Sequence, residues 1–147
     1  MLKLWLQFRF KNITKVYWLA YPMEITFHRA FDLVKEPFKA MYKLIDLGFN
    51  RILSSGQKRT AELGMELLKE LKNKSVGQIT IMPGAGINIK NCLKFKKEIF
   101  EAIHLSAWQP FRKENLSDKS NNIKTFDYVI GHSEKNIIKD IILKINK

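Results

Sequence analysis

Short apolar segments that end in polar or glycine residues recur along this chain, and each runs toward a stretch with helical periodicity. The segments occupy residues 24–28, 50–54, 78–82 and 102–106. Strands that alternate with helices pair in parallel through right-handed crossovers. The pattern therefore predicts an α/β fold of about four βα units with parallel strands, in which ligands bind at the carboxyl ends of the strands.

The predicted helices have recognisable starts and stops. Pro37 can open the first of them, and Gly48 can end it. Thr60 and Asn88 are the predicted N-caps of the second and third helices, and the last helix is predicted to start near Ser133. Their apolar residues stand at helical spacing: Phe38, Met41, Tyr42 and Ile45; Leu63, Leu67, Leu68 and Leu71; Ile89 and Leu93; and Ile137, Ile138, Ile141, Ile142 and Ile145.

Two further segments do not fit these units. Apolar residues alternate with polar ones over residues 2–10, which favours a half-buried strand, and residues 12–21 fit a short helix equally well. Residues 112–122 are rich in Ser, Asp, Lys and Asn, which predicts a surface loop. We therefore expect an N-terminal segment, residues 1–23, followed by one α/β domain, residues 24–147.

Side chains alternate across a strand, so most of the predicted strands have an apolar set and a mixed set of residues. The apolar set should face the helices, which leaves the mixed set on the opposite surface, the interior of a closed barrel. The mixed set contains Thr26, His28, Thr80, His104 and Ser106. A single histidine in a strand is usually structural and bonded to a neighbour. Two histidines on one face make a functional site as good an explanation as a structural role. His28 and His104 are therefore candidate metal ligands and, with Arg29, candidate catalytic residues.

A glycine turn, Pro83-Gly84-Ala85-Gly86, follows the third predicted strand. Glycine lets the backbone approach a ligand closely, and a following helix presents free N–H groups and the positive end of its dipole. A tight βα turn that needs glycine only for its dihedral angles explains the same residues. The anion-binding alternative predicts that Gly84 and Gly86, with Ser55 and Gly56 after the preceding strand, contact a negatively charged group.

Composition narrows the classes of partner. The net charge is +12 over 147 residues, but the basic residues are nearly all lysines on predicted helix faces and in the tail. Because no nucleic-acid-binding motif accompanies them, we attribute the charge to solvated surfaces rather than to a nucleic-acid partner. No run of about 18 apolar residues occurs, which excludes a membrane-spanning helix. The single cysteine, Cys92, excludes an internal disulfide, argues against a thiolate-rich copper site and favours a reducing, cytoplasmic location.

Four of these motifs together resemble the CutC copper-homeostasis family. They are TFHRAFD at residues 26–32, RILSSG at 51–56, IMPGAGI at 81–87 and IHLSA at 103–107. Their order and spacing are similar to those of the family, and the first motif is highly specific. The resemblance implies a (β/α)₈ TIM barrel, a cytoplasmic location and a role in copper handling, with copper as the bound ion.

The resemblance covers only the second half of such a barrel, which needs about 200 residues or more. We therefore expect a partial TIM barrel, a truncated family member, whose open sheet edges favour a homo-oligomer. Ser54, Ala85 and Leu105 stand where the family typically has Thr, Gly and Gly. The expected function is copper homeostasis with copper ion binding. The alternative is a TIM-barrel enzyme, or a remnant of one, that acts on an anionic or phosphorylated small molecule.

Overall fold

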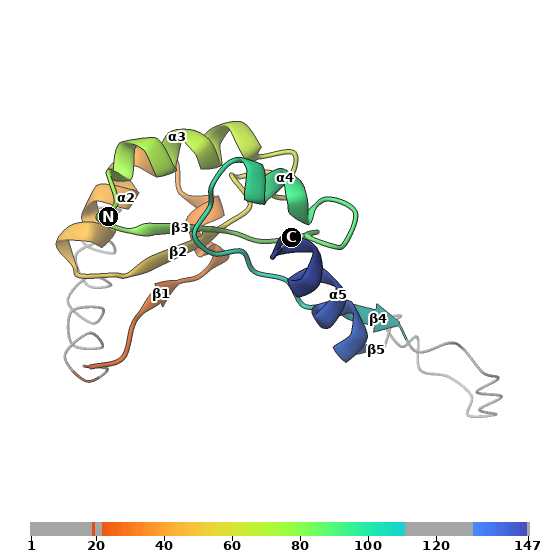
Figure 1. Ribbon diagram of the computed structural model, residues 1–147. Coiled ribbons are helices and arrows are strands. Elements are labelled where there is room, and N and C mark those ends of the chain that lie inside the picture. Colours follow the sequence, from red (N-terminus) through yellow and green to blue (C-terminus); the bar gives the residue numbers. More distant parts are fainter. Residues whose placement is uncertain (1–18, 20–21, 111–130, 147) are drawn as a thin grey trace, which may run out of the picture. The chain divides into compact units, whose positions relative to one another are not determined.

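The computed structural model of the chain describes residue 19 and residues 22–110 and 131–146 (Figure 1). The chain divides into two compact units between Leu105 and Ser106. The first contains β1 (Thr26–Phe27), the 3₁₀ helix η1 (Arg29–Leu33), α2 (Pro37–Asp46), β2 (Arg51–Ser54), α3 (Met65–Ser75), β3 (Thr80–Pro83) and α4 (Cys92–Lys97). The second contains β4 (Trp108–Pro110), β5 (Gly131–Ser133) and α5 (Lys135–Ile145). None of the helices described here is long and apolar enough to span a membrane.

The first unit is built on a parallel sheet with the strand order β1–β2–β3. In its register, Thr26 and Thr80 flank Arg51, and Phe27 and Ile81 flank Ile52. The predicted α/β arrangement with parallel strands is thus confirmed. Each strand begins one or two residues later than the sequence pattern indicates.

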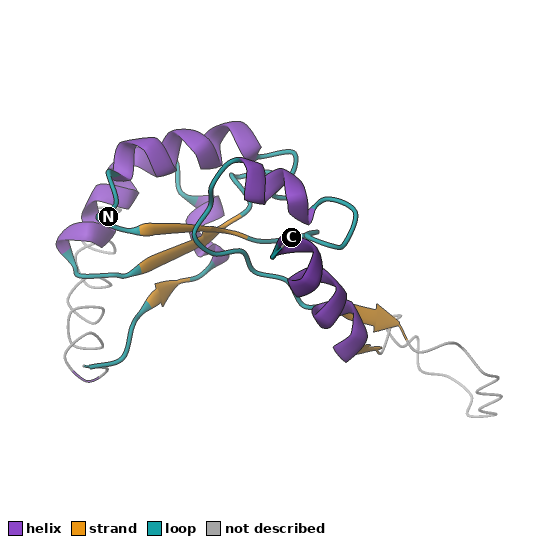
Figure 2. Cartoon of the chain, in the orientation of Figure 1, coloured by secondary structure: helices purple, strands orange, loops and turns teal. Residues whose placement is uncertain are grey.

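Helices α2 and α3 lie on one side of this sheet (Figure 2). The sheet neighbours Ile52 and Ile81 are 0% and 3% exposed, and Met41 of α2 and Leu68 of α3 are fully buried. The predicted apolar side of β3 is therefore the side that packs against helices. Arg51 and Thr80, on the other face, remain partly exposed.

The two ends of helix α2 match the sequence signals. Pro37 is its first residue, a position at which a backbone N–H would have no acceptor within the helix, so proline costs no hydrogen bond there. Its buried stripe is Met41 and Leu44, so of the predicted stripe only Met41 is buried, and Tyr42 is 48% exposed. The chain leaves the helix at Gly48, whose φ of 79° is a conformation that glycine adopts without strain.

The predicted N-caps of the next two helices are wrong. Helix α3 begins after Gly64 and α4 after Asn91, three or four residues later than predicted. Thr60 Oγ1 instead accepts a hydrogen bond from the Leu63 N–H (3.4 Å), and Asn88 Oδ1 accepts one from the backbone two residues on (2.9 Å). Both side chains therefore stabilise a turn that precedes the helix.

The predicted fourth strand, residues 102–106, is reduced to one parallel bridge between Gly84 and His104. The His104 N–H donates to the Pro83 carbonyl oxygen (2.8 Å). Directly afterwards Ala85 and Gly86 have φ values of 84° and 74°, which turn the chain away. Because a ladder needs extended residues on both sides, the bridge cannot lengthen, and the expectation of a full fourth strand is wrong.

The second unit holds a strand pair that the sequence did not predict. Strands β4 and β5 pair antiparallel, with Trp108 opposite Ser133. Helix α5 begins two residues after the predicted start at Ser133, and the Glu134 side chain caps it by accepting from the Asn136 N–H (3.2 Å). The predicted loop at residues 112–122 and most of the N-terminal segment, residues 1–23, lie outside the described residues.

Candidate functional site

The 3₁₀ helix η1 starts directly after β1 and places two charged side chains at the carboxyl end of the sheet. His28 is its N-cap, because His28 Nδ1 accepts a hydrogen bond from the Ala30 N–H (3.0 Å). Arg29 and Asp32 are three residues apart in this turn, and Arg29 Nε donates to Asp32 Oδ2 (2.8 Å). The TFHRAFD motif therefore folds into a capped turn that carries a local ion pair.

Asp32 joins this turn to the end of β2. Its Oδ1 accepts hydrogen bonds from Ser54 Oγ (2.6 Å), from the Ser55 N–H (3.0 Å) and from the Gln57 N–H (3.3 Å). The Asp32 side chain is only 9% exposed. One carboxylate thus holds together η1 and the loop that follows β2, and we call Arg29, Asp32, Ser54 and Ser55 the Asp32 network.

The pKa of the Asp32 carboxyl lies below its ordinary value of 3.8. Burial raises this pKa, but the hydrogen bonds from Ser54, Arg29, Ser55 and Gln57 lower it by more. The group is therefore ionised at neutral pH, with both oxygens engaged by donors of the protein. Such a carboxylate is suited to positioning its neighbours rather than to accepting a proton from a substrate.

The Arg29 guanidinium is fixed along one edge only. Besides the bond to Asp32, Arg29 Nη2 donates to Ser55 Oγ (3.0 Å), which lies 2.6 Å from the Lys58 carbonyl oxygen. The Arg29 side chain is 45% exposed. The guanidinium has five N–H donors in a rigid plane, so the donors on its other edge face solvent.

The two candidate histidines occupy different situations. Because His28 Nδ1 accepts the capping hydrogen bond, a neutral His28 ring carries its proton on Nε2, which leaves no free lone pair for a metal. This ring also stacks on Phe27, with centroids 5.6 Å apart. His104 is exposed, and in the part of the chain that the structure describes its ring nitrogens have no hydrogen-bond partner. Of the two candidates, His104 therefore has the more accessible ring nitrogens.

Gly84 sits between the end of β2 and His104. Its N–H donates to the Ser54 carbonyl oxygen (2.9 Å), which extends the pairing of β2 and β3 by one residue. A Cβ at this position would stand 2.5 Å from Leu53 Cδ1 and 3.4 Å from His104 Cβ. A side chain at this position would displace the end of the Leu53 side chain and contact His104.

The backbone of the predicted anion site is largely engaged within the protein. The N–H groups of Ser55, Gly56 and Gly84 donate to Asp32, to Ser54 Oγ and to the Ser54 carbonyl oxygen. Helix α4 begins at Cys92, six residues after Gly86, so its N-terminus does not follow the glycine turn directly. An anion on Gly86 stays a prediction.

Sequence reasoning overlooked Asp32 and Ser54 as parts of the site. Two signals were present in the motifs. Asp32 stands three residues after Arg29, the spacing at which side chains of one helical turn meet. Ser54 retains a hydroxyl where the resembling family typically has threonine, and this hydroxyl is the donor that Asp32 binds at 2.6 Å.

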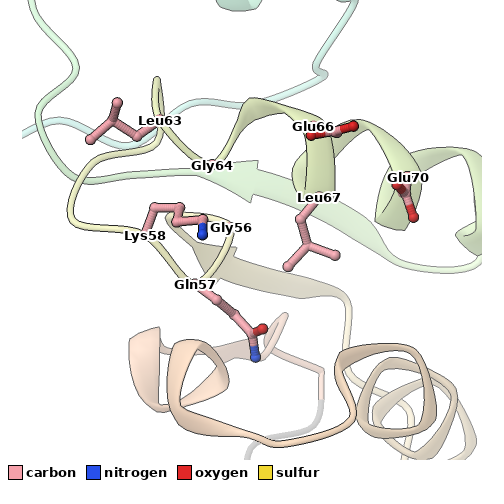
Figure 3. Close-up of a pocket in the computed structure, with 8 residues that line it drawn as sticks. All are labelled: Gly56, Gln57, Lys58, Leu63, Gly64, Glu66, Leu67 and Glu70. Atoms are coloured by element: carbon pink, nitrogen blue, oxygen red, sulfur yellow. The ribbon is translucent and has the colours of Figure 1, made fainter.

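A cavity of about 320 Å³ opens beside the Asp32 network, between the loop after β2 and helix α3 (Figure 3). Gln57 and Lys58 line it from the loop, and Glu66 and Glu70 line it from α3. Two carboxylates against one ammonium group disfavour an anionic occupant. Gly56 is the single predicted site residue in its lining.

The described residues hold no cluster of three His, Cys, Asp or Glu side chains that could bind a metal ion. Cys92 is fully buried, with its Sγ 3.7 Å from the Ile89 carbonyl oxygen. Copper(I) prefers thiolate, thioether and imidazole ligands. Of these, the strand ends offer the His104 imidazole and the half-buried Met82 thioether of β3, which do not by themselves complete a copper site.

Comparison with known proteins assigns the family. The model of the CutC family matches residues 7–109, a range that includes the Asp32 network and His104. A CutC family protein from Proteus mirabilis is 49% identical over 132 residues, which are 84% of this chain and 52% of that protein. One from Bacteroides fragilis is 39% identical over 130 residues, which are 84% of this chain and 51% of that protein.

A solved structure agrees with these relatives. The crystal structure of CutC from Streptococcus agalactiae, a candidate copper homeostasis protein, matches with a TM-score of 0.58 and 25% sequence identity. The match covers 64% of this chain and 48% of that chain. The chain spans about half the length of the curated relatives it matches. On the family match and the similarity of its relatives, the chain belongs to the CutC family.

Proposed function

We propose that this chain takes part in copper homeostasis and that its ligand-binding residues lie at the carboxyl ends of β1, β2 and β3. The observation that carries the proposal is that the family match over residues 7–109 contains the Asp32 network and His104. A relative with the same fold, from Streptococcus agalactiae, is a candidate copper homeostasis protein. In open parallel sheets, ligands bind outside the carboxyl ends of the strands, which also supports this location.

The proposal includes the architecture and the assembly. The three parallel strands would form part of a (β/α)₈ barrel, and the protein would act in the cytoplasm as a homo-oligomer. Among the described residues β1 pairs only with β2, and an unpaired strand edge favours association with another sheet. A second copy would then supply the copper ligands that His104 lacks.

An enzyme that acts on an anionic substrate is the less favoured function. The carboxylate nearest the strand ends, Asp32, has a lowered pKa and bonds both of its oxygens to donors of the protein. A general base needs a free lone pair and a pKa near the working pH.

The copper part of the proposal predicts that His104→Ala weakens Cu(I) binding about tenfold or more, because one imidazole ligand is lost from a site with few ligands. Equilibrium dialysis of the full chain with Cu(I) under reducing conditions measures the affinity. His132→Ala is the control, because His132 is also an exposed imidazole but lies 3.3 Å from the Glu134 carboxylate in the second unit. Equal affinities for the wild type and the His104 variant would remove His104 from the copper site.

A further inference from the structure

We infer that the free edge of the Arg29 guanidinium binds a small oxyanion, a phosphate or carboxylate group, and that Asp32 is the residue that positions Arg29 for it. The site is separate from the copper ligand proposed above, because a permanently charged guanidinium is not a ligand for copper. It also differs from the glycine turn, whose Gly84 N–H is already bonded to Ser54.

The geometry of Arg29 is that of a preorganised receptor. Asp32 holds Nε at 2.8 Å and Ser55 holds Nη2 at 3.0 Å, so one edge of the guanidinium is fixed against the protein. In the described part of the chain the opposite edge has no acceptor, and the side chain is 45% exposed. An arginine with a rigid, outward edge loses little side-chain entropy when two parallel N–H groups bind two oxygens of one anion.

Asp32 fixes this arrangement from the inner edge of the guanidinium. Its charge is delocalised over hydrogen bonds from Ser54, Ser55 and Gln57 as well as from Arg29. The carboxylate, 9% exposed, is therefore satisfied by donors of the protein itself. A carboxylate in this role orients the cation and would not compete with an incoming anion for the outer N–H groups.

Positive charge elsewhere on the chain also favours an anion. Arg59 is exposed on the loop after β2, with no acidic partner among the residues the structure describes. The net charge of +12 adds a long-range attraction that salt will screen.

Titration of the isotopically labelled full chain with inorganic phosphate, followed through the Arg29 Nε–Hε resonance, tests the site directly. At constant ionic strength, phosphate should shift this resonance in a saturable way, and chloride should not. The Arg59 Nε–Hε resonance is the internal control and should move little. A phosphate titration that leaves Arg29 unmoved would overturn the inference.

Two variants separate geometry from charge. Arg29→Lys keeps the positive charge but loses the planar pair of donors, so phosphate should bind about tenfold more weakly. Arg59→Gln removes one charge from the loop after β2 and should weaken binding by about twofold or less at physiological salt. Equal losses in the two variants would show that charge alone attracts phosphate and would contradict the site.

Asp32→Asn tests the positioning role through the sign of the effect. If the only effect of Asp32 on phosphate is electrostatic repulsion, removing its negative charge should strengthen phosphate binding. If Asp32 positions Arg29, phosphate binding should weaken in this variant. The chemical shift of the Arg29 Nε–Hε resonance should then move toward the value of an arginine in an unfolded chain. Should this variant fail to fold, the wild-type titration and Arg29→Lys still decide. Neither readout depends on copper, so failure here and failure of the copper proposal are separate results.

Discussion

Replacing Asp32 with alanine is expected to lower the free energy of unfolding by about 3 to 4 kcal/mol. The change leaves the buried Ser54 hydroxyl and the Ser55 and Gln57 N–H groups without their acceptor. The bond from Arg29 contributes less, because that side chain is half exposed and can turn to water. Urea denaturation followed by circular dichroism measures the difference.

The control for this prediction is Asp46→Ala. Asp46 is an exposed aspartate in the last turn of α2, and its loss should change the stability by about 0.5 kcal/mol or less. A loss of comparable size in both variants would mean that Asp32 has no special structural role.

Lowering the pH should remove the contribution of ionised Asp32 to the free energy of unfolding. Because its folded-state pKa lies below 3.8, the stabilisation is complete above pH 3.8 and is lost as the pH falls through the folded-state pKa. The stability gap between wild type and Asp32→Ala should therefore narrow as the pH falls below about 4. A gap of constant size over this range would contradict the lowered pKa.

Replacing Gly64 with alanine is expected to lower the free energy of unfolding by about 3 kcal/mol or more, for steric reasons alone. A Cβ at Gly64 would stand 2.0 Å from the Ser55 carbonyl oxygen and 2.8 Å from Gly56 Cα. These atoms belong to the backbone that carries the Asp32 network, so they cannot move without disturbing it. The φ of Gly64 is −96°, a value that any residue adopts, so backbone strain does not contribute to the expected loss of stability.

Gly77→Ala is the matched control. Gly77 has a φ of 75°, but a Cβ there would meet no atom within 4 Å. Its substitution should cost about 1 kcal/mol, the penalty for a left-handed alanine. Thermal unfolding of both variants separates the two effects, and a smaller loss for Gly64→Ala than for Gly77→Ala would refute the close packing of Gly56 and Gly64.

The sequence predicts those parts of the fold that depend on local patterns. The parallel strands β1, β2 and β3 follow from short apolar segments, and the ends of α2 follow from Pro37 and Gly48. The starts of α3 and α4 were mispredicted because Thr60 and Asn88 bond to turns before these helices. Whether such a residue caps a helix or a preceding turn depends on how the loop folds back, which spacing does not reveal.

The candidate site depends on contacts between residues far apart in the chain. Asp32 meets Ser54 and Ser55 across 22 and 23 positions, and no periodicity connects them. His28 looks like a ligand in the sequence, yet its Nδ1 is used two residues away as a helix cap. Conversely, Arg29 was identified from the motif, and its contact with Ser55 brings two of the predicted site residues together.

A double-mutant cycle between Asp32→Ala and Ser54→Ala most directly tests whether one carboxylate joins the ends of β1 and β2. The 2.6 Å bond between the two side chains predicts a coupling free energy of about 1 to 2 kcal/mol. The pair Asp32→Ala and Ser75→Ala provides the reference. Ser75 is also buried, but its hydroxyl donates to the Lys72 carbonyl oxygen in α3, so the stability losses of these two substitutions should be additive. Coupling for Ser54 no larger than that for Ser75 would contradict the account of this site.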